Sequence, residues 1–272
     1  AAYRQEFSLP VIAVGGSNGK TSTKELIAAV LRQKLNTLWS EASFNNDVGV
    51  PATLLRLEKT HQAAVVEVGT NHPGEMAALL QLVQPQFGVI TNIGREHLEF
   101  FGDLDGVAQE EGALAEVLPA SGKLFLNGDN EWSGALAQRT KATVVRVGAA
   151  ASCDWRVRNV KLDKNGATFS VEAPQEEFSG SYRIGLLGRH QVGNALFAIA
   201  LGAELGWDRL EQHARDWFDY SEQRMAAAGA GARLPWRRAY ASVNSAPRNR
   251  IWLLKYTQTM ITSTVPTAPY AP

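Results

Sequence analysis

The sequence of 272 residues is poor in the features that mark secreted, membrane-spanning and strongly charged proteins. It has one cysteine, Cys153, so no internal disulfide framework forms, and we expect this thiol to be inert packing. No apolar run reaches the ~18–20 residues that span a bilayer, and no signal-peptide pattern opens the sequence. Lys and Arg number 27 together, as do Asp and Glu, so the charge gives no reason to expect nucleic acid or membrane insertion. These absences favour the reducing cytoplasm as the location of the protein.

What the sequence does contain is an alternation of apolar β-branched runs with amphipathic segments. The runs that we interpret as strands are residues 10–14, 63–68, 87–91, 123–126 and 143–147. Helical spacing of apolar residues is found over 20–35, 73–83, 104–118 and 132–138. The alternation predicts an α/β fold of P-loop type, with a mostly parallel, doubly wound sheet covered on both faces.

The pattern changes after residue 150. Two expected strands, 155–162 and 167–172, flank Asn165-Gly166, a dipeptide typical of tight hairpins. A third strand is expected at 182–187, followed by helices at 191–205 and 208–218. We therefore predict a small antiparallel patch attached to the parallel sheet.

The last fifty or so residues have a different composition. From Ser221 onward there is one acid, Glu222, against seven bases, and residues 226–232 are low in complexity. We expect a domain over residues 1–224 and an irregular, partly disordered tail over 225–272.

A glycine-rich loop joins the first expected strand to the first expected helix. The segment 15–22 reads GGSNGKTS, and the general Walker pattern has a glycine where this sequence has Val14, so the loop is a variant one residue shorter. Lys20 supplies a charge to the β- and γ-phosphates, and the Thr21 hydroxyl suits Mg²⁺. A glycine-rich turn that binds nothing is the weaker alternative. The expected nucleotide contacts are Gly16, Ser17, Asn18, Gly19, Lys20, Thr21 and Ser22.

Two further candidates follow neighbouring strands. Glu67 lies near the end of the expected strand 63–68, where a carboxylate is costly unless it binds a metal or forms a buried salt bridge, and we favour the metal. His97 follows the next strand at the same edge of the sheet. Alone it reads as a surface histidine, and beside Glu67 it becomes a candidate metal ligand.

Amide-rich and histidine-containing loops supply the remaining candidates. The loop 43–51 contains Asn45 and Asn46, which serve either plain turn chemistry or contact with a substrate. His190 and Asn194 are four residues apart and share a helix face if the helix has begun. Asn194 suits the edge of a base, and helix capping is the alternative for this pair.

Taken together, these segments resemble the central ATP-binding domain of the Mur ligases of peptidoglycan synthesis. The resemblance covers roughly residues 8–220. The motifs that carry it are GSNGKT at 16–21, Asn45-Asn46 with Gly49 and Pro51, Glu67 with Gly69, Asn92-Ile93-Gly94 with His97, Asn127 with Asp129, and Gly188 with His190 and Asn194. Within the family, residues 70–76 and the Asn45-Asn46 loop are most similar to members that add D-alanyl-D-alanine to UDP-MurNAc-tripeptide.

The resemblance implies a cytoplasmic, monomeric enzyme that uses ATP and Mg²⁺ to form an amide bond through an acyl phosphate. It implies that Lys20 holds the phosphates, that Thr21, Glu67 and His97 serve the metal, and that His190 and Asn194 serve the adenine. Related amide ligases, such as the meso-diaminopimelate-adding, folylpolyglutamate and cyanophycin enzymes, remain alternatives. So does a nucleotide-binding module without turnover.

The sequence also departs from the family pattern. Glu111 stands at about the place of a lysine that family members carry in carbamylated form. The family's N-terminal and C-terminal domains have no counterpart in the sequence. We hypothesise that the reading frame shifts near Met225, so that Arg233 onward is out-of-frame translation, and translation of the other two frames of the gene tests this.

Overall fold

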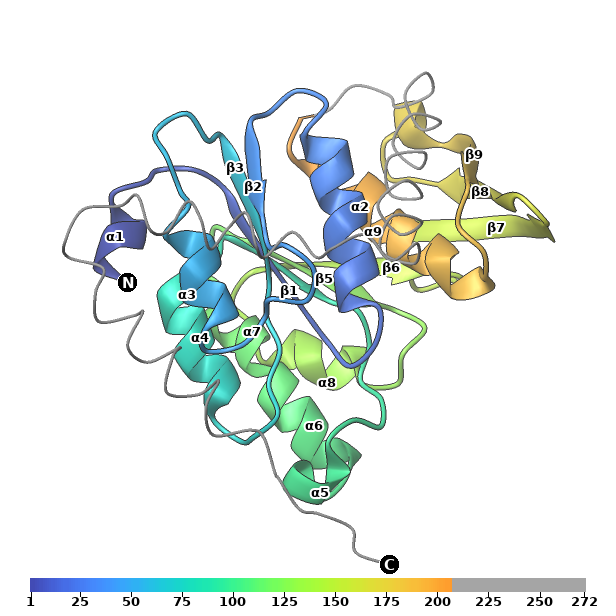
Figure 1. Ribbon diagram of the computed structural model, residues 1–272. Coiled ribbons are helices and arrows are strands. Elements are labelled where there is room, and N and C mark those ends of the chain that lie inside the picture. Colours follow the sequence, from blue (N-terminus) through green and yellow to red (C-terminus); the bar gives the residue numbers. More distant parts are fainter. Residues whose placement is uncertain (207–272) are drawn as a thin grey trace, which may run out of the picture. The chain divides into compact units, whose positions relative to one another are not determined.

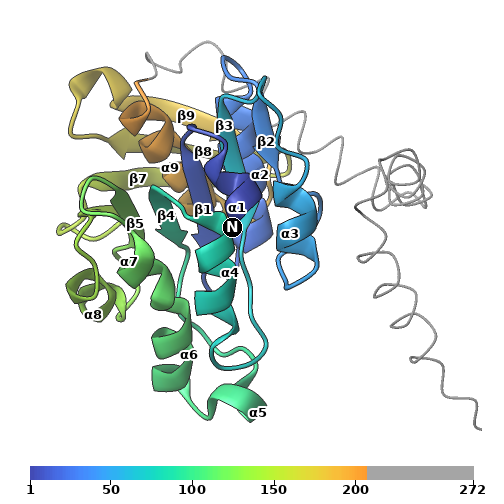
Figure 2. The same ribbon diagram turned by 90° about the vertical axis from the view of Figure 1, so that its left-hand side faces the viewer.

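A computed structural model describes residues 1–206 of the chain. The expected helix over 208–218, the domain boundary at 224 and the tail over 225–272 lie outside the described residues. Figures 1 and 2 show the arrangement of the helices and strands in two views at right angles.

The described strands form one mixed sheet with the order β2-β3-β1-β4-β5-β6-β7-β8-β9. The pairs from β2 to β7 are parallel, and the pairs β7–β8 and β8–β9 are antiparallel. The strands are β1 (Val11–Gly15), β2 (Thr37–Trp39), β3 (Ala63–Glu67), β4 (Phe87–Ile90), β5 (Lys123–Asn127), β6 (Thr143–Gly148), β7 (Trp155–Asp163), β8 (Gly166–Glu172) and β9 (Gly180–Ile184). The predicted fold class is confirmed.

Helices cover both faces of the sheet because successive residues of each strand point to opposite sides. Ile12 and Val14 of β1 belong to the core beneath α2 and α9, whereas Val11 and Ala13 belong to the core beneath the helices of the other face. Figure 1 shows α2 and α9 together on one side. The helices are α1 (Ala2–Gln5), α2 (Lys20–Leu31), α3 (Gly49–Leu54), α4 (Glu75–Val83), α5 (Leu98–Phe101), α6 (Leu104–Glu111), α7 (Ala113–Val117), α8 (Ser133–Gln138) and α9 (Arg189–Glu204), with a 3₁₀ turn, η1, at Glu176–Phe178.

The antiparallel patch is confirmed, and its first turn is the predicted one. Asp163 pairs with Gly166 across the turn, and Gly166 has a φ of +131°, which favours glycine. Behind the patch, Trp155, Phe169 and Tyr182 are buried in the core beneath α9. Cys153 is buried as well, in keeping with its expected packing role.

One of the predicted helices is divided in the structure. The segment 104–118 forms two helices, α6 and α7, that meet at Gly112. Arg139 donates hydrogen bonds to the carbonyls of Ala108 (2.7 Å) and Gln109 (2.9 Å), and a side chain at position 112 would meet its guanidinium group. The last carbonyls of α6 are thus bound by an arginine from α8's C-terminal end. Apolar periodicity continues across the interruption, which is why the sequence suggested one helix.

Candidate nucleotide and metal site

The loop 15–22 lies where the strand order reverses, because β1 has β3 on one side and β4 on the other. Ligands of open α/β sheets bind outside the carboxyl ends of the strands at such a reversal. The loop after β4 is fastened to the loop after β1 there. Ser17 N–H donates to the carbonyl of Asn92 (2.8 Å), and the Asn92 side chain exchanges two hydrogen bonds with the backbone of Asn18 (3.2 and 2.9 Å).

Two glycines shape this loop. Gly16 and Gly19 have φ values of +105° and +84°, in the region that only glycine adopts readily. A Cβ atom on Gly16 would also lie 2.8 Å from Thr91 N and 2.9 Å from Asn92 O. Since Gly19 is the N-terminal cap of α2, the helix begins at Lys20 and its positive end faces the loop. The local structure is thus the strand–loop–helix unit expected of a phosphate site.

Lys20 lies across the loop. Its Nζ donates to the carbonyls of Gly16 (2.5 Å) and Ser17 (3.2 Å) and forms an ion pair with Glu96 Oε2 (3.3 Å). Sequence reasoning missed Glu96, because the neighbouring His97 was the more recognisable metal ligand. The structure therefore brings the residue before His97, rather than His97 itself, to the lysine.

Glu67 meets Thr21 at the end of β3. The parallel register places Glu67 opposite Val14, just before the loop. Its Oε1 accepts hydrogen bonds from Thr21 Oγ1 (3.1 Å) and Asn45 Nδ2 (2.9 Å), whereas its buried Oε2 has no hydrogen-bond partner. That second oxygen lies 3.8 Å from Nζ of Lys24, so the carboxylate is also one half of a buried ion pair. Burial raises the pKa of Glu67, and the charge of Lys24 opposes this rise.

The donor atoms at this position fit a magnesium ion. Mg²⁺ takes oxygen ligands, commonly one or two carboxylates together with water and phosphate oxygens. The Thr21 hydroxyl and the Glu67 carboxylate are such donors; the hydroxyl is hydrogen-bonded to Oε1, and Oε2 has no hydrogen-bond partner. Within residues 1–206 no three His, Cys, Asp or Glu side chains gather into a metal cluster, so the fit is to an ion that keeps non-protein ligands.

His97 stands apart from this pair. It precedes α5 with a left-handed backbone (φ +45°), and its ring packs edge-on against Phe101 at 6.4 Å. In the described part of the chain its ring forms no hydrogen bond or ion pair with Glu67 or Thr21. Of the three predicted metal ligands, Thr21 and Glu67 are therefore in contact with each other, whereas His97 packs against α5.

The two amide side chains of the loop 43–51 have different roles. Asn45 donates to Glu67 as described, and its backbone carbonyl accepts from Gly69 N–H (2.9 Å). Asn46 accepts from the backbone N–H groups of Val48 (3.3 Å) and Gly49 (2.9 Å) at the start of α3. Asn46 is thus engaged in the turn chemistry that was one of the two interpretations, whereas Asn45 is part of the site.

His190 and Asn194 both lie in the first turns of α9, as the spacing suggested. Asn194 is buried, and its amide oxygen lies 2.9 Å from where a Cβ on Gly19 would be, so it packs directly on the glycine loop. His190 is exposed and its ring lies over the backbone of Gly188. The capping interpretation is wrong, because no side chain caps this helix at Gly188.

Glu111, the last residue of α6, also contacts the glycine loop. It is 1 % exposed; Oε2 accepts a hydrogen bond from Gly16 N–H (2.6 Å), and Oε1 has no hydrogen-bond partner. Burial raises the pKa of Glu111 to about 7, while the charge of Lys20 opposes and that of Glu96 adds to the rise. This carboxylate therefore contacts the backbone of the phosphate loop directly.

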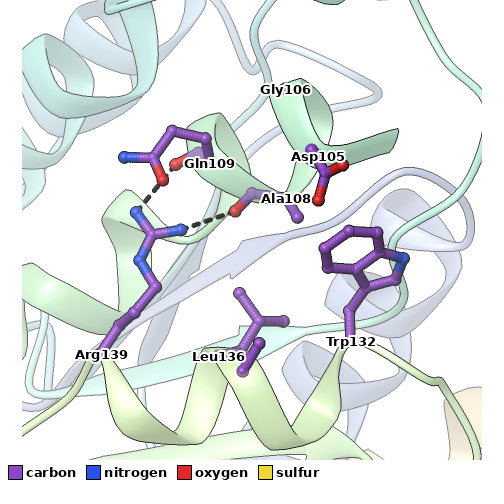
Figure 3. A pocket seen from close by; sticks show the side chains of 8 residues that line it. Asp105, Gly106, Ala108, Gln109, Trp132, Leu136 and Arg139 are labelled. Carbon is purple, nitrogen blue, oxygen red and sulfur yellow. Dashed lines mark hydrogen bonds between the residues drawn. The ribbon is translucent and has the colours of Figure 1, made fainter. Parts of the chain in front are cut away.

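A pocket between α6 and α8 lies beside this helix end (Figure 3). In it Arg139 points at the last carbonyls of α6, the helix that ends in Glu111. The lining residues are Asp105, Gly106, Ala108, Gln109, Trp132, Ala135, Leu136 and Arg139. None of the predicted site residues is among them.

A glycine loop at the switch point of a mostly parallel sheet, followed by Lys-Thr at a helix start, defines an α/β domain of the P-loop type. Residues 14–202 match the Mur ligase middle domain, and the chain belongs to this family.

Within this family, the chain is similar to several individually named ligases. The chain is 39% identical over 211 residues to the UDP-N-acetylmuramoyl-tripeptide–D-alanyl-D-alanine ligase of Escherichia coli K12, covering 76% of this chain and 46% of that protein. It is 35% identical over 206 residues to the enzyme of the same name from Bacillus subtilis, covering 75% and 43%. A crystal structure of MurF from Acinetobacter baumannii superposes with a TM-score of 0.72 at 31% identity, covering 80% and 46%. The chain thus spans about half the length of the relatives it matches.

Proposed function

We propose that this chain carries the ATP site of a ligase that adds D-alanyl-D-alanine to UDP-MurNAc-tripeptide. Both named relatives act in this reaction by their names, and the family assignment agrees. The substrates are small molecules, and in the described residues no helix combines the length and apolarity needed to cross a membrane. We place the protein in the cytoplasm and expect it to act as a monomer.

In the proposed reaction, an oxygen of the tripeptide's terminal carboxylate attacks the γ-phosphorus of ATP, and ADP leaves. The dipeptide's amine then attacks the acyl carbon, and phosphate leaves as the amide forms. Catalysis of phosphoryl transfer rests mainly on positioning and charge neutralisation. The loop amides and Lys20 would hold the phosphates, and Asn194 with His190 would serve the adenine side.

Thr21 and Glu67, with His97 as a further candidate, would hold Mg²⁺. When bound, the ion supplies charge neutralisation at the phosphate oxygens. The single observation that carries the proposal is the pairing of Thr21 with a buried Glu67 whose second oxygen has no hydrogen-bond partner, directly behind the glycine loop. A glycine-rich turn that binds nothing does not explain why this carboxylate, besides its ion pair with Lys24, keeps an oxygen without a hydrogen bond at that place.

Phosphate release tests the proposal. The chain is incubated with ATP, Mg²⁺, UDP-MurNAc-tripeptide and D-alanyl-D-alanine, and each component is omitted in turn. Phosphate release that requires both substrates supports a working ligase. Binding of ATP with no release under any condition supports the alternative of a nucleotide-binding module without turnover, and failure to bind ATP contradicts both.

A further inference from the structure

A second lysine of α2, Lys24, is fully buried one turn beyond Lys20. Its exposed fraction is 0 %, which is rare for lysine unless the charge is paired. Because an unpaired buried ammonium group is very costly, the groups around Lys24 identify what the charge is for.

The ammonium group of Lys24 contacts four groups. It donates to the backbone carbonyls of Ser40 (2.8 Å) and Ala42 (2.6 Å). It also faces two carboxylates, Glu25 at 2.9 Å and Glu67 at 3.8 Å. The side chain of Glu25 is 24% exposed and that of Glu67 is 1% exposed. Since water screens the first pair and not the second, the charge of Lys24 matters most to Glu67.

The two carbonyls belong to the segment that carries Asn45. Ser40 follows β2, and its Oγ accepts a hydrogen bond from Glu67 N–H (3.0 Å). Ala42 has a φ of +46°, a left-handed conformation that costs free energy for alanine. The hydrogen bond from Lys24 to the Ala42 carbonyl holds that conformation, and three residues later Asn45 reaches Glu67.

We propose that Lys24 is a positioning residue that fixes both Glu67 and the segment 40–45 relative to α2, the helix that follows the glycine loop. The Lys24 side chain has no described hydrogen bond or ion pair with the segment 15–22, and it acts through Glu67 and Asn45. This inference rests on the proposed function, because it assumes that Glu67 serves Mg²⁺.

Removal of the charge tests the role. Lys24→Met keeps the aliphatic stem and loses the ammonium group. We expect its ATP affinity in the presence of Mg²⁺ to fall at least tenfold, because the carboxylate and Asn45 lose their common tether. ATP affinity in EDTA should change less than threefold, because Lys20 and the glycine loop are untouched. A merely structural role would lower both affinities together.

Two further variants sharpen the test. Glu25→Gln removes the nearer carboxylate but leaves the two carbonyl contacts and Glu67, so both affinities should stay within threefold of the wild type. Lys24→Met combined with Ala42→Gly should recover part of the lost Mg²⁺-dependent affinity, because glycine adopts the left-handed backbone without the tether.

Circular dichroism establishes which variants fold, and Lys24→Gln replaces Lys24→Met if the latter does not. If neither folds, Lys24 is a structural residue and the inference is overturned. Equal losses with and without Mg²⁺, or no loss, overturn it as well. A wild-type chain that gains no affinity from Mg²⁺ instead contradicts the proposed function, so the two failures are distinguishable.

Discussion

The carboxyl edge of the parallel strands and the antiparallel patch use their polar residues in opposite ways. In the described part of the chain, the buried carboxylate oxygens that lack a hydrogen-bond partner are Glu67 Oε2 and Glu111 Oε1, both at the parallel edge. In the patch, the acids are exposed and paired: Glu172 with Arg156 and Arg158, and Asp163 with Arg183.

The difference indicates that residues at the parallel edge lower the free energy of unfolding, whereas those of the patch do not. Burying a carboxylate with spare hydrogen-bonding capacity costs free energy, and a protein keeps such groups where they bind something. The patch instead buries aromatic rings on one side and exposes ion pairs on the other, as a purely structural element does. We therefore expect changes in the patch to alter stability and changes at the edge to alter nucleotide binding.

The largest effect should come from the core of the patch. Phe169 is buried and its ring stacks on Tyr182 at 6.0 Å. Phe169→Ala should lower the free energy of unfolding by about 3–5 kcal/mol, because a large cavity is left. Urea denaturation measures the loss. At a temperature where the variant remains folded, ATP affinity should match the wild type, and a parallel loss of affinity would break the comparison.

Lys20→Ala should have the opposite effect: ATP affinity should fall and the free energy of unfolding should stay nearly the same. A charge-assisted contact with phosphate is lost, so ATP binding should weaken by about 2–3 kcal/mol, as measured by calorimetry. The same variant should unfold at nearly the wild-type urea concentration, because the lysine is partly exposed and its protein contacts lie within the loop region. Unchanged ATP affinity would remove Lys20 from the site.

Glu111 should make stability depend on pH. Burial raises its pKa from an ordinary 4.5 to about 7, so the folded state binds more protons than the unfolded state between these values. Its contribution is therefore full below pH 4.5 and is lost as pH rises through about 7. Relative to Glu111→Gln, which does not titrate, the wild type should lose stability on the order of 2 kcal/mol between about pH 5 and pH 8.

Denaturation of both proteins across that pH range measures this difference. Glu99→Gln, the same substitution at an exposed position, is the control and should follow the wild type. A constant difference between the wild type and Glu111→Gln would show that the carboxylate does not titrate in this range.

The smallest effect should come from the exposed face of the patch. Arg158→Ala breaks a pair with Glu172 in which both side chains are well exposed. Such pairs contribute about 0–1 kcal/mol, so the free energy of unfolding should change by less than ~1 kcal/mol and ATP affinity should not change. A larger loss of stability in the same urea titration would mean that the polar residues of the patch are not simply exposed, weakly interacting pairs.

Much of this division was predictable from the sequence. The glycine loop, the strand that carries Glu67 and the Asn-Gly hairpin are local signals, and the structure has each of them at its predicted place or within one residue of it. Lys24 was missed because a lysine one turn after Lys20 looks like a solvated charge, and only the return of the segment 40–42 buries it. The strand β2 was too short to show a period, and Glu96 was overshadowed by His97.

We propose above all that Glu67 makes the glycine loop a magnesium-dependent ATP site. The most direct measurement is the ratio of ATP affinity in Mg²⁺ to ATP affinity in EDTA, obtained by calorimetry for the wild type and for Glu67→Ala. We predict a ratio well above one for the wild type and a ratio close to one for a folded Glu67→Ala. An unchanged ratio in the variant would contradict the claim and reduce Glu67 to the buried partner of Lys24.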